Sequence, residues 1–156
     1  MSSYLNFYVV PRLSKKKYDY TKDDGHTEVE IKLSEGLPLL LLNYSRNSDI
    51  YQAYNDTLNP AYGGMEEKYT ELSYEDAQRV AREFENDLEK SEQRLAINYK
   101  MLKEGGYSSE LWEEIQSGET YVAEQKESLE ELRFIANLVY EIKTWGDFEK
   151  ILINID

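Results

Sequence analysis

Two stretches of helical periodicity, separated by a pair of glycines, constrain the fold of this chain more than any other feature. Apolar residues recur at intervals of three and four over 74–103 and again over 118–143, the spacing that aligns side chains along one face of an α-helix. Gly105-Gly106 ends the first stretch, because glycine is the usual residue just beyond a helix C-terminus. We therefore predict two long helices that pack antiparallel as a hairpin.

The hairpin carries further boundary signals. Ser73 is placed to cap the first long helix, with Asp76 three residues on, near the positive end of the helix dipole. A short helix is predicted over 109–116, and Ser117-Gly118 is expected to separate it from the second long helix. The sequence thus predicts a break in the second arm of the hairpin.

The remaining segments have the composition of β-strands, being rich in aromatic and β-branched residues or alternating between apolar and charged ones. These segments are residues 4–10, 28–33, 37–44 and 148–156. The last contains isoleucine at the alternate positions Ile151, Ile153 and Ile155, which need a covered face, so we expect it to return to the N-terminal sheet.

Together these elements predict a single α+β domain over residues 1–156. Its sheet, antiparallel or mixed and of about four strands, is drawn from 1–44 and 148–156, and the long antiparallel helical hairpin packs on one face of it. A chain of this length buries roughly two-thirds of its unfolded surface, enough for a core of its own.

Negative charge is concentrated in the helical half of the sequence. Residues 66–156 have 23 Asp and Glu against eleven Lys and Arg, a net −12 within the total of −13. A surface of this sign repels phosphate backbones and anionic lipids, so we expect neither direct nucleic-acid binding nor membrane binding. Lys15-Lys16-Lys17 is a local basic cluster, but Asp19 follows it closely, and we interpret it as a solvated loop.

Missing residue types exclude several classes of site. The chain has no Cys, which removes disulfides, thiolate nucleophiles, zinc–thiolate sites and iron–sulfur clusters. His26 is the single histidine, and neither glycine-rich phosphate-binding motif occurs. We therefore assign no catalytic residue, no metal ligand and no cofactor.

The sequence shows no signal-peptide pattern and no apolar run long enough to span a bilayer, and we expect a cytoplasmic protein.

Glutamates on the two long helices resemble, in spacing alone, the E-x-x-E motifs of helical Mg²⁺-dependent nucleotide pyrophosphatases. Glu89 and Glu92 belong to the first helix, and Glu127, Glu130 and Glu131 to the second. Carboxylates bind a hard cation when they converge, whereas the apolar stripe places those of the first helix at or beyond its edge. With 31 acidic residues in the chain such pairs arise by chance, so we interpret them as solvated.

The turn around Arg46 is the most suggestive candidate binding site. It joins a buried strand to a helix predicted over 48–58, which Asn47 or Ser48 caps and Asn59-Pro60 ends. Free backbone N–H groups at such a helix end favour an anion. The candidate ligand-binding residues are Tyr44, Ser45, Arg46, Asn47, Ser48, Tyr51 and Tyr54. The ordinary alternative is that these tyrosines form the apolar face of the helix.

The charge distribution favours a non-catalytic acidic interaction protein. Such a protein would be an inhibitor, an immunity protein or a phage-type counter-defence factor whose hairpin covers a basic surface of a protein partner. One alternative is a protein that binds or sequesters a small anionic ligand of the nucleotide type at the Arg46 turn. Another is a virion or assembly component, which would form a defined homo-oligomer. Ordinary solubility explains the acidic face equally well.

Overall fold

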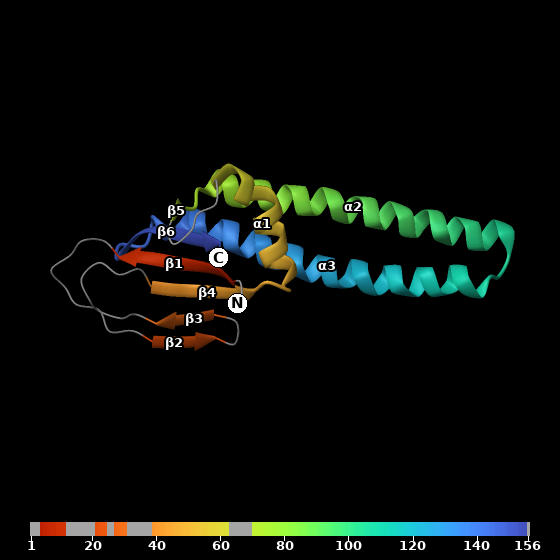
Figure 1. Ribbon diagram of the computed structural model, residues 1–156, viewed down its shortest axis with the longest axis horizontal. Helices are drawn as coiled ribbons and strands as arrows, with labels where there is room; N and C mark the ends of the chain where they lie inside the picture. Colours follow the sequence, from red (N-terminus) through yellow and green to blue (C-terminus); the bar gives the residue numbers. More distant parts are fainter. Residues whose placement is uncertain (1–3, 12–20, 25–26, 31–38, 63–69, 156) are drawn as a thin grey trace.

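The computed structural model of the protein describes residues 4–11, 21–24, 27–30, 39–62 and 70–155. These residues form a six-stranded sheet and three helices (Figure 1). The strands are β1 (Tyr4–Pro11), β2 (Thr21–Asp24), β3 (Thr27–Glu30), β4 (Leu39–Ser45), β5 (Thr70–Glu71) and β6 (Phe148–Ile155). The basic cluster at Lys15-Lys16-Lys17, His26 and the residues 31–38 lie outside the described part.

The predicted α+β architecture is confirmed. The strands lie in the order β2-β3-β4-β1-β6-β5, and every neighbouring pair is antiparallel. The four predicted strands correspond to β1, β3, β4 and β6. The two further strands are short segments at the sheet edges, of four and two residues, and are too brief to show an alternating pattern.

The central strands present one apolar face. β1 lies between β4 and β6, with Phe7 opposite Leu42 on one side and Ile153 on the other. Every second side chain of a strand points to the same face. The buried side chains on this face are Leu5, Phe7 and Val9 from β1 and Ile151, Ile153 and Ile155 from β6. The C-terminal strand therefore returns to the N-terminal sheet, as predicted.

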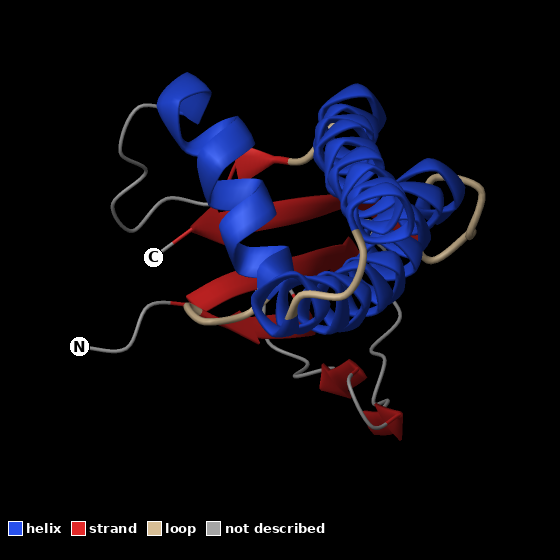
Figure 2. Ribbon diagram, turned by 90° about the vertical axis from the view of Figure 1, so that its right-hand side faces the viewer, coloured by secondary structure: helices blue, strands red, loops and turns tan. Residues whose placement is uncertain are grey.

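Three helices cover this face. α1 (Asp49–Tyr62) contacts β1 and β4, while α2 (Tyr74–Gly105) and α3 (Ser109–Ile142) pack antiparallel on each other and α3 contacts β6. Figure 2 looks along the hairpin and shows α1 beside it, over the sheet. The sheet, α1 and the near half of the hairpin share one hydrophobic core. The far half of the hairpin extends beyond the sheet (Figure 1).

Serine caps begin all three helices. The hydroxyl oxygens of Ser48, Ser73 and Ser108 accept hydrogen bonds from the N–H groups of Ile50, Asp76 and Leu111, at 3.2, 3.0 and 3.4 Å. Each cap pairs one of the backbone donors that a helix N-terminus leaves unsatisfied. The predicted cap at Ser73 is confirmed, and of the two candidates Asn47 and Ser48 it is Ser48 that caps α1.

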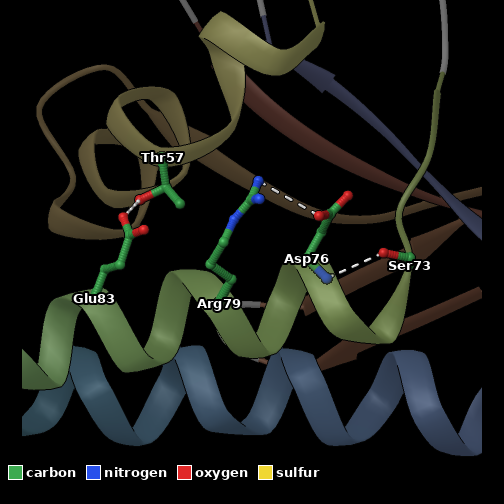
Figure 3. A network of polar contacts seen from close by, with 5 residues as sticks. All are labelled: Thr57, Ser73, Asp76, Arg79 and Glu83. Carbon is green, nitrogen blue, oxygen red and sulfur yellow. Dashed lines mark hydrogen bonds and ion pairs between the residues drawn. The ribbon is translucent and has the colours of Figure 1, made fainter.

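A polar network joins α1 to the first turns of α2 (Figure 3). The Thr57 hydroxyl donates to Glu83 Oε2 at 3.0 Å, and Arg79 lies 3.5 Å from the Asp76 carboxylate within α2. Exposed contacts of this kind contribute little free energy each. Of the two, the Thr57–Glu83 hydrogen bond is the one that links α1 to α2.

The turn of the hairpin depends on Gly106. Its φ angle is 81°, in the left-handed region that side chains disfavour, and its N–H donates to the Leu102 carbonyl at 3.1 Å. This geometry ends α2 after Gly105, as the glycine pair predicts.

The predicted break at Ser117-Gly118 is wrong, because α3 is continuous from Ser109 to Ile142. A Cβ atom at position 118 would lie 3.2 Å from Leu95 Cδ1, so glycine allows α2 and α3 to approach closely here. Glycine lowers helix propensity by about 1 kcal/mol relative to alanine. Packing against α2 outweighs that local preference.

The predicted end of α1 at Asn59-Pro60 is also wrong, since the helix continues to Tyr62. Proline removes one backbone donor from a helix. Close to the C-terminus this loss affects the last turn alone, so the helix is not interrupted.

Candidate functional site

The residues of the predicted Arg46 site are divided between the core and the surface. Tyr51 and Tyr54 are 6% and 0% exposed, and the ring of Phe7 packs edge-on against Tyr54 with centroids 5.2 Å apart. Ser45, Arg46 and Asn47 are exposed in the turn, and Ser48 is the helix cap. The buried tyrosines are thus the apolar face of α1. Anion binding at the turn stays a prediction that concerns its exposed residues.

Tyr44 connects this turn to α3. Its hydroxyl donates a hydrogen bond to Glu131 Oε1 at 2.5 Å, and its ring lies edge-on to Phe7. Burial of the phenol, and then its hydrogen bond to Glu131 and the charge of that carboxylate, raise the pKa of Tyr44 well above its usual value. The phenol therefore stays protonated and serves as a structural donor, not as a base.

Tyr44→Phe should lower the free energy of unfolding by about 1 kcal/mol near neutral pH, because it removes the donor to Glu131. A phenol with a raised folded-state pKa stabilises the fold below about pH 10, its unfolded value, and this contribution is lost as the pH rises above it. The difference between wild type and Tyr44→Phe should therefore shrink above pH 10. Urea unfolding at several pH values measures it.

Tyr107→Phe is the matched control, because Tyr107 is 77% exposed. It should leave stability unchanged within about 0.5 kcal/mol at every pH. A Tyr44→Phe difference that is constant with pH would show that the Tyr44 phenol ionises alike in the folded and unfolded states.

A surface groove of about 770 Å³ lies between α2 and α3 in the far half of the hairpin. We call residues 91–121 the arm and this hollow the arm groove. Its walls include Arg94 and Leu95 from α2 and Glu110, Glu114, Gly118 and Tyr121 from α3. In Figure 1 this part of the hairpin extends away from the sheet and from α1, so the groove is open to a partner.

The groove exists because the contact between the helices is incompletely filled in the arm. Small residues line it at Ser91, Ser117 and Gly118. Ile115 is the one fully buried side chain of the arm, whereas Leu95 and Leu111 are half-buried. Nearer the sheet, α3 buries nearly every residue of the same stripe. The arm therefore buries fewer apolar side chains between its two helices than the near half of the hairpin does.

The arm groove is strongly polarised. Glu110, Glu113 and Glu114 line the end nearer the turn of the hairpin. Arg94 lies beside Leu95, which is level with Gly118, at the other end. The first 17 residues of α3 contain five glutamates and no lysine or arginine. Carboxylates along a concave surface focus a negative potential that attracts cations.

Large apolar side chains are exposed in the arm, and Tyr121 among them lines the groove. Six of the nine large hydrophobic residues that are exposed in the described part of the chain belong to the arm. They are Ile97, Tyr99, Met101, Tyr107, Trp112 and Tyr121. Tyrosine and tryptophan next to charged groups are typical of protein interfaces, whereas scattered exposed apolar residues need no explanation. In the described part of the chain, most such residues are therefore concentrated in one protruding element.

No three or more His, Asp or Glu side chains of the described residues are placed to hold a metal ion, and Glu89, Glu92, Glu127 and Glu130 are exposed. None of the described helices is long and apolar enough to cross a membrane.

The apolar spacing of the sequence predicts a continuous α3 along the groove, although the low helix propensity of Gly118 favours a break there. The spacing of Leu111, Ile115, Gly118 and Val122, at intervals of four, three and four, continues the helical stripe without interruption. Gly118 is therefore a small residue within a continuous contact with Leu95, and it lines the groove.

In comparisons with known proteins, no family model, no curated protein and no solved structure matches this chain.

Proposed function

We propose that this chain is a non-catalytic binding protein whose arm docks on a basic surface of another protein, as an inhibitor, an immunity protein or a phage-type counter-defence factor does. The observation that carries the proposal is the arm groove. There, Glu110, Glu113 and Glu114 line the same hollow as the half-exposed ring of Tyr121.

The electrostatics support a cationic partner. A net charge of −13, with an excess of carboxylates on α3, speeds association with a positively charged surface and disfavours acidic partners. Steering of this kind weakens with salt, because the Debye length falls to about 8 Å at physiological ionic strength. Binding by the arm should therefore be salt-dependent.

The exposed aromatic residues can supply binding energy, which electrostatic steering alone does not. Trp112 and Tyr121 are 38% and 53% exposed, and such side chains contribute most of the binding energy when a partner covers them. An element that extends beyond the body of the protein can enter a cleft of the partner. This geometry suits an inhibitor that fills a basic site.

Capture experiments with matched charge variants test the proposal. The double variant Glu113→Lys/Glu114→Lys reverses two charges in the groove, and Glu127→Lys/Glu130→Lys reverses two exposed charges of the same helix outside it. Tagged proteins are incubated with lysate of the native cell at low and high salt. We expect a basic protein that the wild type and the second variant retain at low salt and that the groove variant loses, with affinity at least about tenfold weaker.

Equal capture by both variants would show that the acidic surface acts without a defined site. Capture that does not weaken with salt would contradict the role of charge. Circular dichroism checks that both variants remain helical.

A further inference from the structure

We propose that the arm groove receives a single amphipathic α-helix of the partner, which lies along α2 and α3 as a third helix and carries its cationic residues towards the turn of the hairpin. This inference rests on the proposed function and names the element of the partner that the arm recognises.

The shape of the groove fits a helix. Its α3 wall runs from Glu110 to Tyr121, which at a rise of 1.5 Å per residue is about 16 Å, or three turns. The other wall is α2, antiparallel to α3. Rows of side chains on a third helix fit between two such walls, as in helical bundles.

The exposed part of Leu95 gives the partner helix an apolar contact. Leu95 is half-buried and lines the groove together with Ser117, while its inner side packs against Gly118. A leucine or isoleucine side chain of the partner that enters the groove would cover Leu95 and part of Tyr121. The area removed from water on both sides then stabilises the complex.

The charges of the groove fix the direction of the docked helix. Carboxylates at Glu110, Glu113 and Glu114 line the end near the turn, and Arg94 stands at the other end. A helix has a positive N-terminal end and a negative C-terminal end. The favourable orientation places the N-terminus and the Lys or Arg side chains of the partner near the turn, so that its C-terminus meets Arg94. The partner helix therefore runs parallel to α3.

Synthetic peptides provide the probe. One fluorescent peptide of about 20 residues, long enough to form a helix in isolation, has leucines at helical spacing, lysines in its N-terminal half and glutamates in its C-terminal half. A second has the two charged halves exchanged, and a third has the first composition with a central proline that breaks the helix. Fluorescence anisotropy with the full chain gives the affinities.

The first peptide should bind at least about tenfold more tightly than the proline peptide, and several-fold more tightly than the exchanged one. Ser117→Trp fills the groove from an exposed position of α3 and should abolish this binding. Ala123→Trp, at an exposed position outside the groove, is the matched control and should leave the affinity unchanged. Both substitutions lie on the surface, so the chain should remain folded.

The outcomes separate this inference from the proposed function. Equal binding of the helical and proline peptides would overturn the helical partner while the basic-surface function stands. Binding that survives Ser117→Trp but not Glu113→Lys/Glu114→Lys would show that the carboxylates bind without a helix seated along the groove, which overturns the inference. No binding of any peptide overturns the inference. Sedimentation of the free chain as a dimer that Ser117→Trp dissociates would show that a second copy occupies the groove.

Discussion

Tyr54→Ala should lower the free energy of unfolding by about 3–5 kcal/mol, the usual cost of removing a buried aromatic ring. Tyr54 has no exposed surface, and its ring packs edge-on against Phe7 from β1. The truncation leaves a cavity where α1 meets the sheet, and the rigid strands around it cannot collapse to fill it. Urea denaturation monitored by far-UV circular dichroism measures the loss.

Arg46→Ala is the control for this prediction, since Arg46 is exposed in the turn before α1. It should change stability by no more than about 0.5 kcal/mol. Comparing Tyr54→Ala with Arg46→Ala distinguishes a ligand site at the Arg46 turn from a helix whose tyrosines belong to the core. If Tyr54→Ala left stability unchanged and weakened the binding of a nucleotide-type anion, the tyrosine would belong to a ligand site and not to the core.

Gln125→Leu should raise the free energy of unfolding by about 1–2 kcal/mol. Gln125 is 5% exposed within the apolar stripe of α3, between Val122 and Leu129, and its Oε1 has no hydrogen-bond partner among the described residues. Leucine has a similar volume and removes the cost of a desolvated carbonyl. Thermal denaturation should show a midpoint higher by about 2–8 °C.

Gln116→Leu, at an exposed position of the same helix, should leave the midpoint nearly unchanged. A fall in stability on Gln125→Leu would mean that the Gln125 amide is hydrogen-bonded in solution through a water molecule. A buried polar residue in a helix pair also helps to set its register. Size-exclusion chromatography of Gln125→Leu beside the wild type tests whether the substitution changes the oligomeric state.

Much of the fold follows from local patterns. The stripe of apolar residues over 74–103 and the glycine pair after it predict α2 and its end, and Ser73 predicts the cap that the structure contains. The alternate isoleucines of β6 predict a buried strand that pairs with the N-terminal sheet. These features are determined by neighbouring residues, which is why a single sequence is sufficient to find them.

The candidate site was harder to predict, because its character depends on which surfaces meet. Tyr51 and Tyr54 have the same residue type as Tyr121, yet they are buried and Tyr121 is 53% exposed. Tyrosine is amphipathic and suits either environment. Its position relative to the sheet, and not its neighbours in the sequence, decides whether it belongs to the core or to a binding surface.

The sequence by itself determined the two long helical periodicities, the excess of acid in the helical half and the lack of cysteine. Tertiary structure decided that α3 continues through Gly118, because close packing against Leu95 outweighs the weak helix propensity of glycine. It also decided where the acidic surface becomes a groove. The hairpin extends beyond the sheet, so most apolar side chains of its far half stay exposed or half-buried.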